Sequence, residues 1–564
     1  MNRTLVSGLG AAALCLTLSC GSRSPYWNTA PGTAGSIGLN SGVALLDSAN
    51  SRLVMLTAVA GDELGPLQSV PVGHNVAAEI PSPDGTSLLV LSTGDSLSGT
   101  PSAEPASLTL VAPATSATMG SAFSSQRYVM QAPMPNLAVD PLGTYAVGYI
   151  GASGQSTFLQ NKNEIVIFDL TRAPSTTAPL NPVFRSLRSF GGTPQQLTFT
   201  PPLSMPAGWT YAATRRLLVV ESEIDVTLLD IDDAFAAVPP SEITVRLTSG
   251  TTAQQITPAG VTVDPGNSAQ SLPPRIAVAS SNDTNVFTLT LEAATPGGPT
   301  DDDFLPSLNL TDVGGIPSNI AFVKTDAGSR LAALVPSTES AVLVEPDTSV
   351  TTSVALPQPY TNLSLVTSAV DPTATGDVAM LWNASTPGGG SALATGSAGV
   401  ALWSLSKSVG QLYGSIDVLD VAPAIEKVLD VGGQNPELKI LQLTGGTGFY
   451  VLDLSDGTAA PLETSETATL EVAPDGARLW AFAFGGTNLG VIDFAATDAL
   501  STLAPIQLST ALPIDAVYDV ARAGGGRSLI AIHNEGTVGA TVFDALNPTQ
   551  TPPHRASGLL LEAP

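Results

Sequence analysis

Short apolar runs separated by turn residues recur along most of the chain, and residues 468–494 show the pattern most fully. This stretch reads ATLEVAPDGARLWAFAFGGTNLGVIDF. The pattern predicts strands at 470–473, 478–484 and 489–494. The first turn between them is Pro-Asp-Gly, in which Pro presets φ, Asp can bond its own backbone and Gly tolerates a positive φ. The stretch is therefore expected to be strand and turn, not helix.

Both faces of the strand 478–484 are apolar, because large aromatic side chains on one face alternate with small side chains on the other. A strand of this kind is expected to be covered on both sides. A single meander cannot supply two covers. Repeated sheets can, since each sheet packs against the sheets before and after it.

Variants of this unit recur along the chain, and residues 42–56 look like one more unit without its first strand. The spacing between equivalent strands is about 40 to 60 residues, which is typical of propeller blades. The third strands of the clear units are expected at 107–111, 164–170, 226–231, 285–291, 341–346, 399–405, 449–454, 489–494 and 540–546.

The fold class that follows is all-β, a single β-propeller of about seven to ten four-stranded antiparallel blades. No linker-like break divides the repeats, which favours one ring. Residues 557–561 form an apolar run without a unit. We expect this run to pair with 42–56, so that N- and C-terminal strands close the ring and remove two exposed edges.

The N-terminus has the features of an export signal. Arg3 precedes an apolar run at 5–18, which is shorter than a typical membrane span of about 20 residues. The run ends in Ser19-Cys20, which resembles the bacterial lipoprotein signal, where a small residue precedes a Cys that is lipidated. In enteric-type bacteria, an Asp directly after that Cys retains the lipoprotein at the inner membrane. Because Gly21 stands in this position, the resemblance implies the outer membrane, on the periplasmic or cell-surface side. An ordinary cleaved signal peptide and an uncleaved anchor are the alternatives.

Three segments follow from these observations. Residues 1–19 are expected to be the signal peptide, 20–40 a flexible tether rich in Gly, Ser, Pro and Thr, and 41–564 the propeller.

Charge and cysteine content narrow the classes of partner. Lys and Arg total 21 against 48 Asp and Glu, a net charge of −27. Long-range repulsion therefore makes nucleic acid and anionic lipid poor partners, and no nucleic-acid partner is expected. Both cysteines, Cys15 and Cys20, lie in the export signal, so the rest of the chain has no disulfide framework and no thiolate metal site.

The stretch APDGARLWAFAFGGTNLGVIDF, at 473–494, resembles the YVTN-type β-propeller repeat, and IPSPDGTSLLVLS, at 80–92, resembles it as well. In that family a DG turn leads to an aromatic-bearing strand, a short Asn/Gly turn and a V-x-V-I-D strand. The resemblance implies a propeller. The family includes surface-layer-like proteins and lactonase-like enzymes, so the resemblance leaves the function open.

Candidate catalytic residues are few. The three histidines, His74, His533 and His554, lie far apart in the sequence. His533 and Glu535 could serve acid–base chemistry, but they occupy a position where the repeat has a hairpin turn, which explains them structurally. No nucleophile elbow, P-loop or Rossmann fingerprint occurs. No catalytic residue, metal ligand or cofactor is therefore expected, and the binding residues stay unknown.

Acidic residues are expected to have structural roles. The clusters 230–233 and 300–303 carry oxygens of the kind that Ca²⁺ prefers, but neither has EF-hand spacing, and a solvated loop is the expected role. The tryptophans Trp382, Trp403 and Trp480 lie on predicted strands and are expected in the core. Aspartates that end third strands are expected to shape turns: Asp169, Asp230, Asp453, Asp493 and Asp544.

These observations favour a lipid-anchored, non-enzymatic propeller that binds an envelope protein or a glycan. The alternatives are a lactonase- or hydrolase-like enzyme with its site in the central channel and a purely structural component. Any binding surface is expected on the face that carries the loops between second and third strands, because 93–106, 151–163 and 384–398 are long there. Tolerated surface insertion explains long loops equally well.

Replacing Cys20 tests the lipid anchor. We expect radiolabelled fatty acid to enter the wild-type protein in cells and not Cys20→Ala, because only a thiol at this position can accept the acyl group. Equal labelling of the two proteins would contradict the anchor.

Overall fold

The computed structural model of the chain describes residues of the ring, from 31 to 562 with gaps. The residues described are 31–59, 63–95, 104–114, 122–151, 161–178, 180–205, 214–236, 240–249, 254–293, 304–366, 377–383, 399–405, 416–419, 425–443, 448–454, 458–463, 467–494, 505–522, 524–534, 538–549 and 553–562.

Ten four-stranded antiparallel sheets, here called blades 1 to 10, make up the fold. The first five are β1 (Thr33–Leu39), β2 (Gly42–Asp47), β3 (Arg52–Leu56), β4 (Gln68–Pro71); β5 (Val76–Pro81), β6 (Leu88–Ser92), β7 (Ser107–Pro113), β8 (Phe123–Val129); β9 (Asn136–Val139), β10 (Tyr145–Tyr149), β11 (Glu164–Asp169), β12 (Val183–Ser186); β13 (Pro194–Phe199), β16 (Leu217–Ser222), β17 (Asp225–Asp230), β18 (Glu242–Arg246); and β21 (Pro258–Asp264), β22 (Arg275–Ser280), β23 (Asn285–Ala293), β24 (Phe304–Asp312).

The second five are β25 (Asn319–Thr325), β26 (Gly328–Val335), β27 (Ser340–Val344), β28 (Thr351–Ala355); β29 (Asn362–Val366), β30 (Val378–Trp382), β31 (Val400–Ser404), β32 (Ile416–Leu419); β33 (Ile425–Gly432), β34 (Asn435–Leu443), β35 (Gly448–Asp453), β36 (Thr458–Glu463); β37 (Ala468–Val472), β38 (Arg478–Ala483), β39 (Asn488–Asp493), β40 (Ile506–Ser509); and β41 (Ala516–Ala521), β42 (Arg527–His533), β43 (Gly539–Asp544), β44 (His554–Ser557).

Small elements join or extend the blades. They are the hairpins β14 (Leu203–Ser204) with β15 (Thr214–Arg215) and β19 (Thr248–Ser249) with β20 (Gln254–Gln255), the 3₁₀ turns η2 (Ser268–Gln270) and η3 (Pro336–Thr338), and the short helix α2 (Leu559–Glu562).

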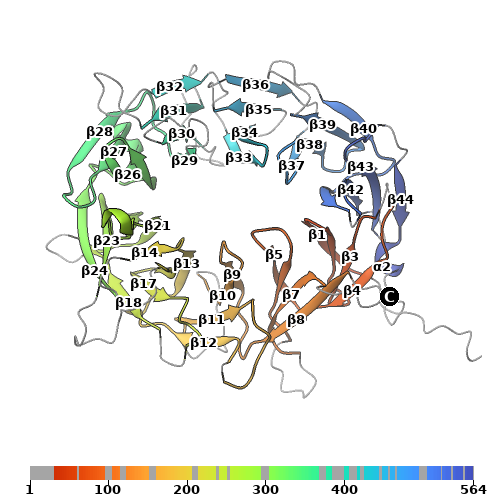
Figure 1. The fold of residues 1–564 in the computed structure, drawn as a ribbon, viewed down its shortest axis with the longest axis horizontal. Helices are drawn as coiled ribbons and strands as arrows, with labels where there is room; N and C mark the ends of the chain where they lie inside the picture. The colour runs from red at the N-terminus through yellow and green to blue at the C-terminus, as the bar shows by residue number, and fades with distance from the viewer. Residues whose placement is uncertain are drawn as a thin grey trace, which may run out of the picture.

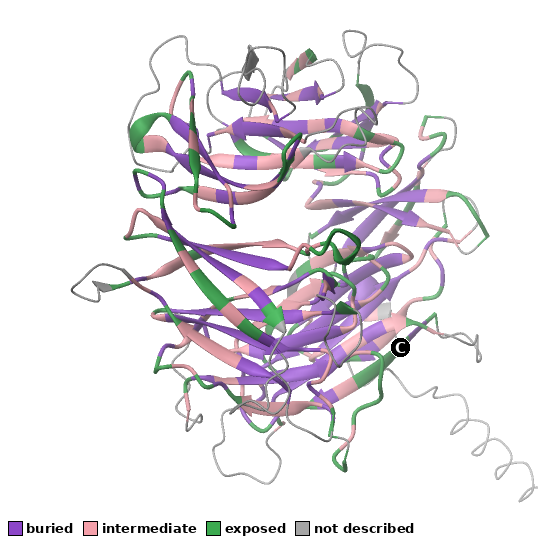
Figure 2. Cartoon of the chain, turned by 60° about the vertical axis from the view of Figure 1, so that its left-hand side comes forward, coloured by how far each residue is buried: buried purple, intermediate pink, exposed green. Residues whose placement is uncertain are grey.

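The blades form one ring, in which the first strand of each lies innermost and the N-terminal blade meets the C-terminal blade (Figure 1). The all-β propeller predicted from the sequence is thereby confirmed, at ten blades. Ten hydrophobic clusters hold the ring, and each is shared by two neighbouring blades. Buried residues accordingly concentrate in the strands, and many turns are exposed (Figure 2). Every blade is covered on both sides, as the two-faced apolar strands require.

The Pro-Asp-Gly turn of blade 9 has the predicted geometry. Gly476 has φ +69° and its N–H donates to Ala473 O at 2.8 Å, while the Asp475 carboxylate accepts from Ala477 N at 3.0 Å. The turn also contacts the preceding blade. Gln434 N donates to Asp475 O at 2.9 Å, and Asn435 Nδ2 donates to Gly476 O at 2.8 Å. The turn therefore joins two blades as well as two strands.

Ring closure differs from the prediction in one respect. The expected strand at 557–561 is wrong, since Ser557 is the last residue of β44 and the chain then enters α2 at Leu559. The missing first strand of blade 1 is instead β1, which pairs with β2 and lies within the segment expected to be a tether. The propeller thus starts near residue 33, not 41. The sequence of β1 is rich in glycine, as in a linker, but packing against blade 10 holds it as a strand.

Complete blades meet at the closure, without exchange of strands. The Tyr518 hydroxyl donates to Ser36 O at 2.6 Å and Ala521 N donates to Asn40 O at 2.6 Å. Arg52, which is buried, pairs with Asp47 at 3.0 Å and donates through Nη2 to Leu560 O. The two ends of the chain are held by these bonds and by the apolar cluster that blades 1 and 10 share.

The two faces of the ring carry different links. The turn face, as we name it, carries the links from first to second and from third to fourth strands. The connection face carries the links from second to third strands and the passages between blades. Three long loops, at 93–106, 151–163 and 384–398, are expected to bind a partner. Most of their residues, namely 96–103, 152–160 and 384–398, lie outside the described part of the chain.

A buried carboxylate lies in the seam between blades 4 and 5. Glu221 is 2% exposed, its Oε2 accepts from Gly260 N at 3.2 Å, and its Oε1 has no hydrogen-bond partner among the described residues. A bulge in β21 between Pro258 and Val261 frees the Gly260 N–H from the strand ladder. Burial raises the pKa of Glu221 to about 7, although the hydrogen bond from Gly260 opposes the shift.

We expect Gly476→Ala to destabilise the ring more than Gly143→Ala does. Both glycines end a turn between first and second strands with nearly equal φ, +69° and +68°. A Cβ at Gly143 meets nothing within 4 Å, whereas a Cβ at Gly476 lies 2.1 Å from Gly432 O of the neighbouring blade. The left-handed φ costs about 1 kcal/mol in both variants, and the clash adds about 1–3 kcal/mol in Gly476→Ala alone. Equal melting temperatures of the two variants would rule out the contact between blades.

Glu221→Gln should change how stability depends on pH. The unfolded carboxylate ionises near pH 4.5 and the folded one near 7, so wild-type stability falls as pH rises through this window. The variant cannot ionise at this position and lacks the penalty, which is about 3 kcal/mol above pH 7. Melting curves should therefore coincide near pH 4 and separate by pH 8, with the variant more stable. A constant difference across this range would contradict a buried titrating Glu221.

Candidate functional site

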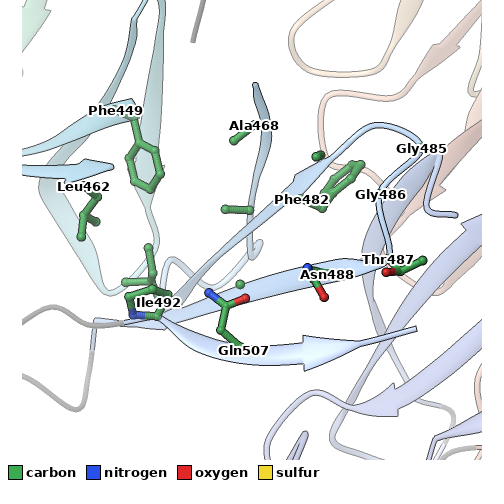
Figure 3. A pocket seen from close by; sticks show the side chains of 14 residues that line it. Phe449, Leu462, Ala468, Phe482, Gly485, Gly486, Thr487, Asn488, Ile492 and Gln507 are labelled. Carbon is green, nitrogen blue, oxygen red and sulfur yellow. The ribbon is translucent and has the colours of Figure 1, made fainter. Parts of the chain in front are cut away.

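A cavity with a volume of about 550 Å³ lies in the seam between blades 8 and 9. Phe449 and Leu462 of blade 8 line one side, and blade 9 supplies the other with Asn488 and Gln507 (Figure 3). The β38–β39 turn, at 484–487, borders the cavity at the connection face. The cavity thus adjoins the connection face, which carries the links expected to form a binding surface.

Small side chains on blade 9 leave this seam partly unfilled. Side chains alternate between the two faces of a strand, so 488, 490 and 492 of β39 face blade 8. Ala481, Gly490 and Gln507 lie side by side on adjacent strands. A Cβ at Gly490 would meet Ala481 O at 3.5 Å and the Pro505 side chain at 3.6 Å, which are ordinary contacts. No close approach of the backbone requires glycine here, and its absent side chain enlarges the hollow.

None of the described residues that line the cavity has an ionisable side chain. Its wall is apolar where Phe449, Leu462 and Ile492 lie, and these residues belong to the cluster of the blade 8–9 seam. The amides of Asn488 and Gln507 are exposed and make no hydrogen bond to the described residues. The complete lining is Phe449, Leu462, Ala468, Ala481, Phe482, Ala483, Gly485, Gly486, Thr487, Asn488, Gly490, Ile492, Pro505 and Gln507.

The described lining has the features of a ligand site. Ligand sites have volumes of about 300–1,000 Å³ and combine an apolar lining with a few polar groups that fix orientation. General acid–base catalysis needs a titratable side chain within hydrogen-bond reach of the substrate, and none of the described lining residues supplies one.

A second candidate region lies on the inner wall of the ring where it closes. A cavity of about 300 Å³ there is lined by residues of blades 1, 2, 9 and 10, among them Ser36, Glu471, Tyr518 and Asp519. Burial raises the pKa of Glu471 and of Glu79 on the inner strand of blade 2. Burial also raises the pKa of Tyr518, and the negative charges of Glu471 and Glu79 add to this shift.

The polar groups of this inner wall hold the ring together. The Tyr518 hydroxyl is hydrogen-bonded to Ser36, and its ring lies over Gly38, where a Cβ would be 2.4 Å from Tyr518 Cδ1. Asp519 pairs with Arg527 at 2.6 Å. Within the described ranges, no group of three His, Cys, Asp or Glu side chains is placed to hold a metal ion.

The three histidines do not come together in the ring. His533 is 1% exposed, and its Nδ1 and Nε2 bond to Pro513 O at 2.7 Å and Thr541 Oγ1 at 2.8 Å. This confirms the structural role expected for His533, while Glu535 lies outside the described residues. His74 pairs with Asp95 at 2.9 Å on the surface, and His554 lies on the outer strand β44.

The expectation of a solvated loop at 230–233 is wrong. Arg215 pairs with Asp230 at 3.2 Å and Asp233 at 2.7 Å. Arg216 pairs with Asp232 at 2.7 Å and reaches Asp140 of blade 3 at 2.6 Å. The cluster is an ion-pair network that joins two blades. The second acidic cluster, at 300–303, lies outside the described residues.

The turn role of the recurring aspartates is confirmed at three positions. The carboxylate of Asp169 accepts from Thr171 N at 3.0 Å, that of Asp230 from Asp232 N at 3.1 Å, and that of Asp544 from Leu546 N at 2.9 Å. Asp493 pairs with Arg478 at 3.1 Å instead.

The tryptophans largely match the expected core. Trp403 and Trp480 are fully buried, whereas Trp382 is half-buried and its indole N–H donates to Ser364 Oγ at 3.3 Å.

Sequence reasoning missed the blade 8–9 cavity. The one signal that could have found it is Gly490 inside the predicted strand 489–494, since glycine in a strand interior marks a bulge or a place where something approaches the backbone. The opposite wall comes from the preceding unit, which a single repeat does not reveal. No helix in the described part of the chain has the length and apolar character needed to cross a bilayer.

No family model matches the chain, and no curated protein matches it either. Solved structures similar to it include dihydro-heme d1 dehydrogenase NirN in complex with DHE, at 12% identity and TM-score 0.37, over 75% of each chain. A putative 6-phosphogluconolactonase from Bacteroides fragilis is 11% identical with TM-score 0.32, over 77% of this chain and 98% of that one. Apo AztD from Citrobacter koseri is 9% identical with TM-score 0.33, over 86% and 97%. At these values the similarities carry no argument about activity, ligand or partner.

Proposed function

We propose that the protein is a lipid-anchored β-propeller of the cell envelope that binds a neutral glycan in the cavity between blades 8 and 9 and catalyses no reaction. The observation that carries this proposal is the described lining of the cavity, in which an apolar wall meets exposed amides and no described residue is ionisable. A neutral ligand loses no charge solvation on entering such a site.

A glycan fits this lining better than a charged partner. A sugar ring has a face of C–H groups and an edge of hydroxyls. The C–H face can pack on the partly exposed Leu462, and the hydroxyls can bond Asn488, Gln507 and Thr487, whose side chains line the cavity. Amide groups suit this role because each supplies both donors and an acceptor.

The cellular address rests on the export signal. The apolar run at 5–18 and the Ser19-Cys20 pair support lipidation at Cys20 and placement at the outer membrane. An envelope glycan would then be within reach of the protein.

A lactonase- or hydrolase-like activity is the second candidate, favoured by the carboxylates of Glu79, Glu471 and Asp519 on inner strands near the closure. Asp519 is already paired with Arg527, which leaves Glu471 as the acid to test. Hydrolysis of a simple lactone by the wild type, lost in Glu471→Gln, would favour this candidate over a pure binding role.

Filling the cavity at Gly490 tests the binding proposal. We expect neutral envelope oligosaccharides on a glycan array to bind the wild type and to bind Gly490→Leu at least about tenfold more weakly, because the new side chain occupies the space of the sugar ring. Gly524→Leu is the matched control, since a Cβ there also meets no obstacle and it lies in the β41–β42 turn of blade 10. Equal binding by both variants, or binding of charged glycans only, contradicts the proposal.

A further inference from the structure

Two aromatic side chains are exposed among the described residues, and both lie on the connection face. Phe484 is 75% exposed at the β38–β39 turn, and Phe190 is 59% exposed in the passage from blade 3 to blade 4. The described Tyr and Trp side chains and the other described Phe are buried or half-buried. Phe484 is the most exposed large apolar side chain among the described residues, so the turn that carries it is a candidate contact surface.

A second apolar residue lies close to Phe484. Leu512, in the passage from blade 9 to blade 10, is also exposed. This passage is tied to the Phe484 turn, since Thr510 N donates to Thr487 O at 2.8 Å and Gly485 N donates to Ile514 O at 2.8 Å. The bonds fix Phe484 and Leu512 on one rigid ledge, here called the 484/512 ledge.

The N-terminal segment enters the ring beside this ledge. Gly35, near the start of β1, lines a cavity of about 300 Å³ together with Phe484. Asp515 and Asn534, which also line it, flank links on the connection face. Because β1 runs from the connection face toward the turn face, the chain that precedes it leaves from the connection face.

The length of that preceding chain limits how far the ring can lie from an anchor at Cys20. Twelve residues, 21–32, separate Cys20 from the start of β1. A fully extended chain spans at most about 3.3–3.6 Å per residue, so the connection face stays within about 40 Å of the anchored residue.

We propose that the connection face is turned toward the membrane and that the 484/512 ledge contacts the lipid surface. The proposal rests on the lipid anchor at Cys20 proposed above. The net charge of −27 makes electrostatic attachment to anionic lipid unfavourable, so the contact is apolar and depends on the anchor for proximity. Burial of an aromatic side chain from a fixed turn adds to the membrane affinity that the acyl chain supplies.

The test tethers the protein chemically, so that it does not depend on lipidation in cells. The chain from residue 20 onward contains a single thiol, Cys20, which can be coupled to a maleimide lipid in phosphatidylcholine vesicles. Amide hydrogen exchange is then compared between tethered protein and uncoupled protein with the same vesicles. We expect slower exchange at 484–488 and 510–514 in the tethered protein and no change at the turn 473–477 on the opposite face.

Two variants separate the ledge from a general effect of the vesicle. Phe484→Ser should reduce the protection at 484–488 by about tenfold, as expected for removal of one buried aromatic side chain. Leu142→Ser, at a site 62% exposed on the turn face, should leave that protection unchanged. Protection at the turn face, equal protection of both faces, or full protection in Phe484→Ser would each overturn the proposal. If Cys20 is not labelled with fatty acid in cells, the lipid anchor is contradicted. The vesicle experiment would still decide which face meets a membrane when residue 20 is tethered.

Discussion

Strands that are apolar on both faces impose the constraint on which the whole molecule depends. The second and third strands of most blades are buried almost throughout, as in β2, β6 and β22. A sheet with two apolar faces needs two covers, and a linear stack would leave its end sheets uncovered. A closed ring has no end sheets, and ten shared clusters fill its ten seams.

Because all blades share one architecture, the seams differ through the residues that fill them. At the closure, Tyr518 lies over Gly38 and bonds Ser36, which fixes the first blade to the last. The seam of blades 4 and 5 encloses Glu221, whose charge opposes burial. Small residues such as Gly490 leave the seam of blades 8 and 9 open. The seams therefore hold the blades together, and one of them contains the proposed ligand site.

The two faces of the ring differ. The turn face carries structural contacts, and the connection face carries the features on which the proposed function rests. The turn face carries tight turns that also bond the neighbouring blade, as at Gly476, and aspartates paired with arginines, as at Asp230. The connection face carries the exposed Phe484 and the β38–β39 turn that borders the blade 8–9 cavity. The chain also enters β1 from this face, which is why we propose that it is turned toward the membrane.

The sequence by itself determined the repeat, its strands and its turns, because strand alternation and the Pro-Asp-Gly turn are local properties. It also determined that His533 and Asp169 have structural roles, since both stand at strand ends of a repeating unit. Only the tertiary structure decided that 33–39 is a strand, that Asp232 and Asp140 share Arg216, and that a cavity adjoins Gly490. Each of these depends on residues that distant or neighbouring units bring together, and no periodicity within one unit records which side chains will meet across a seam.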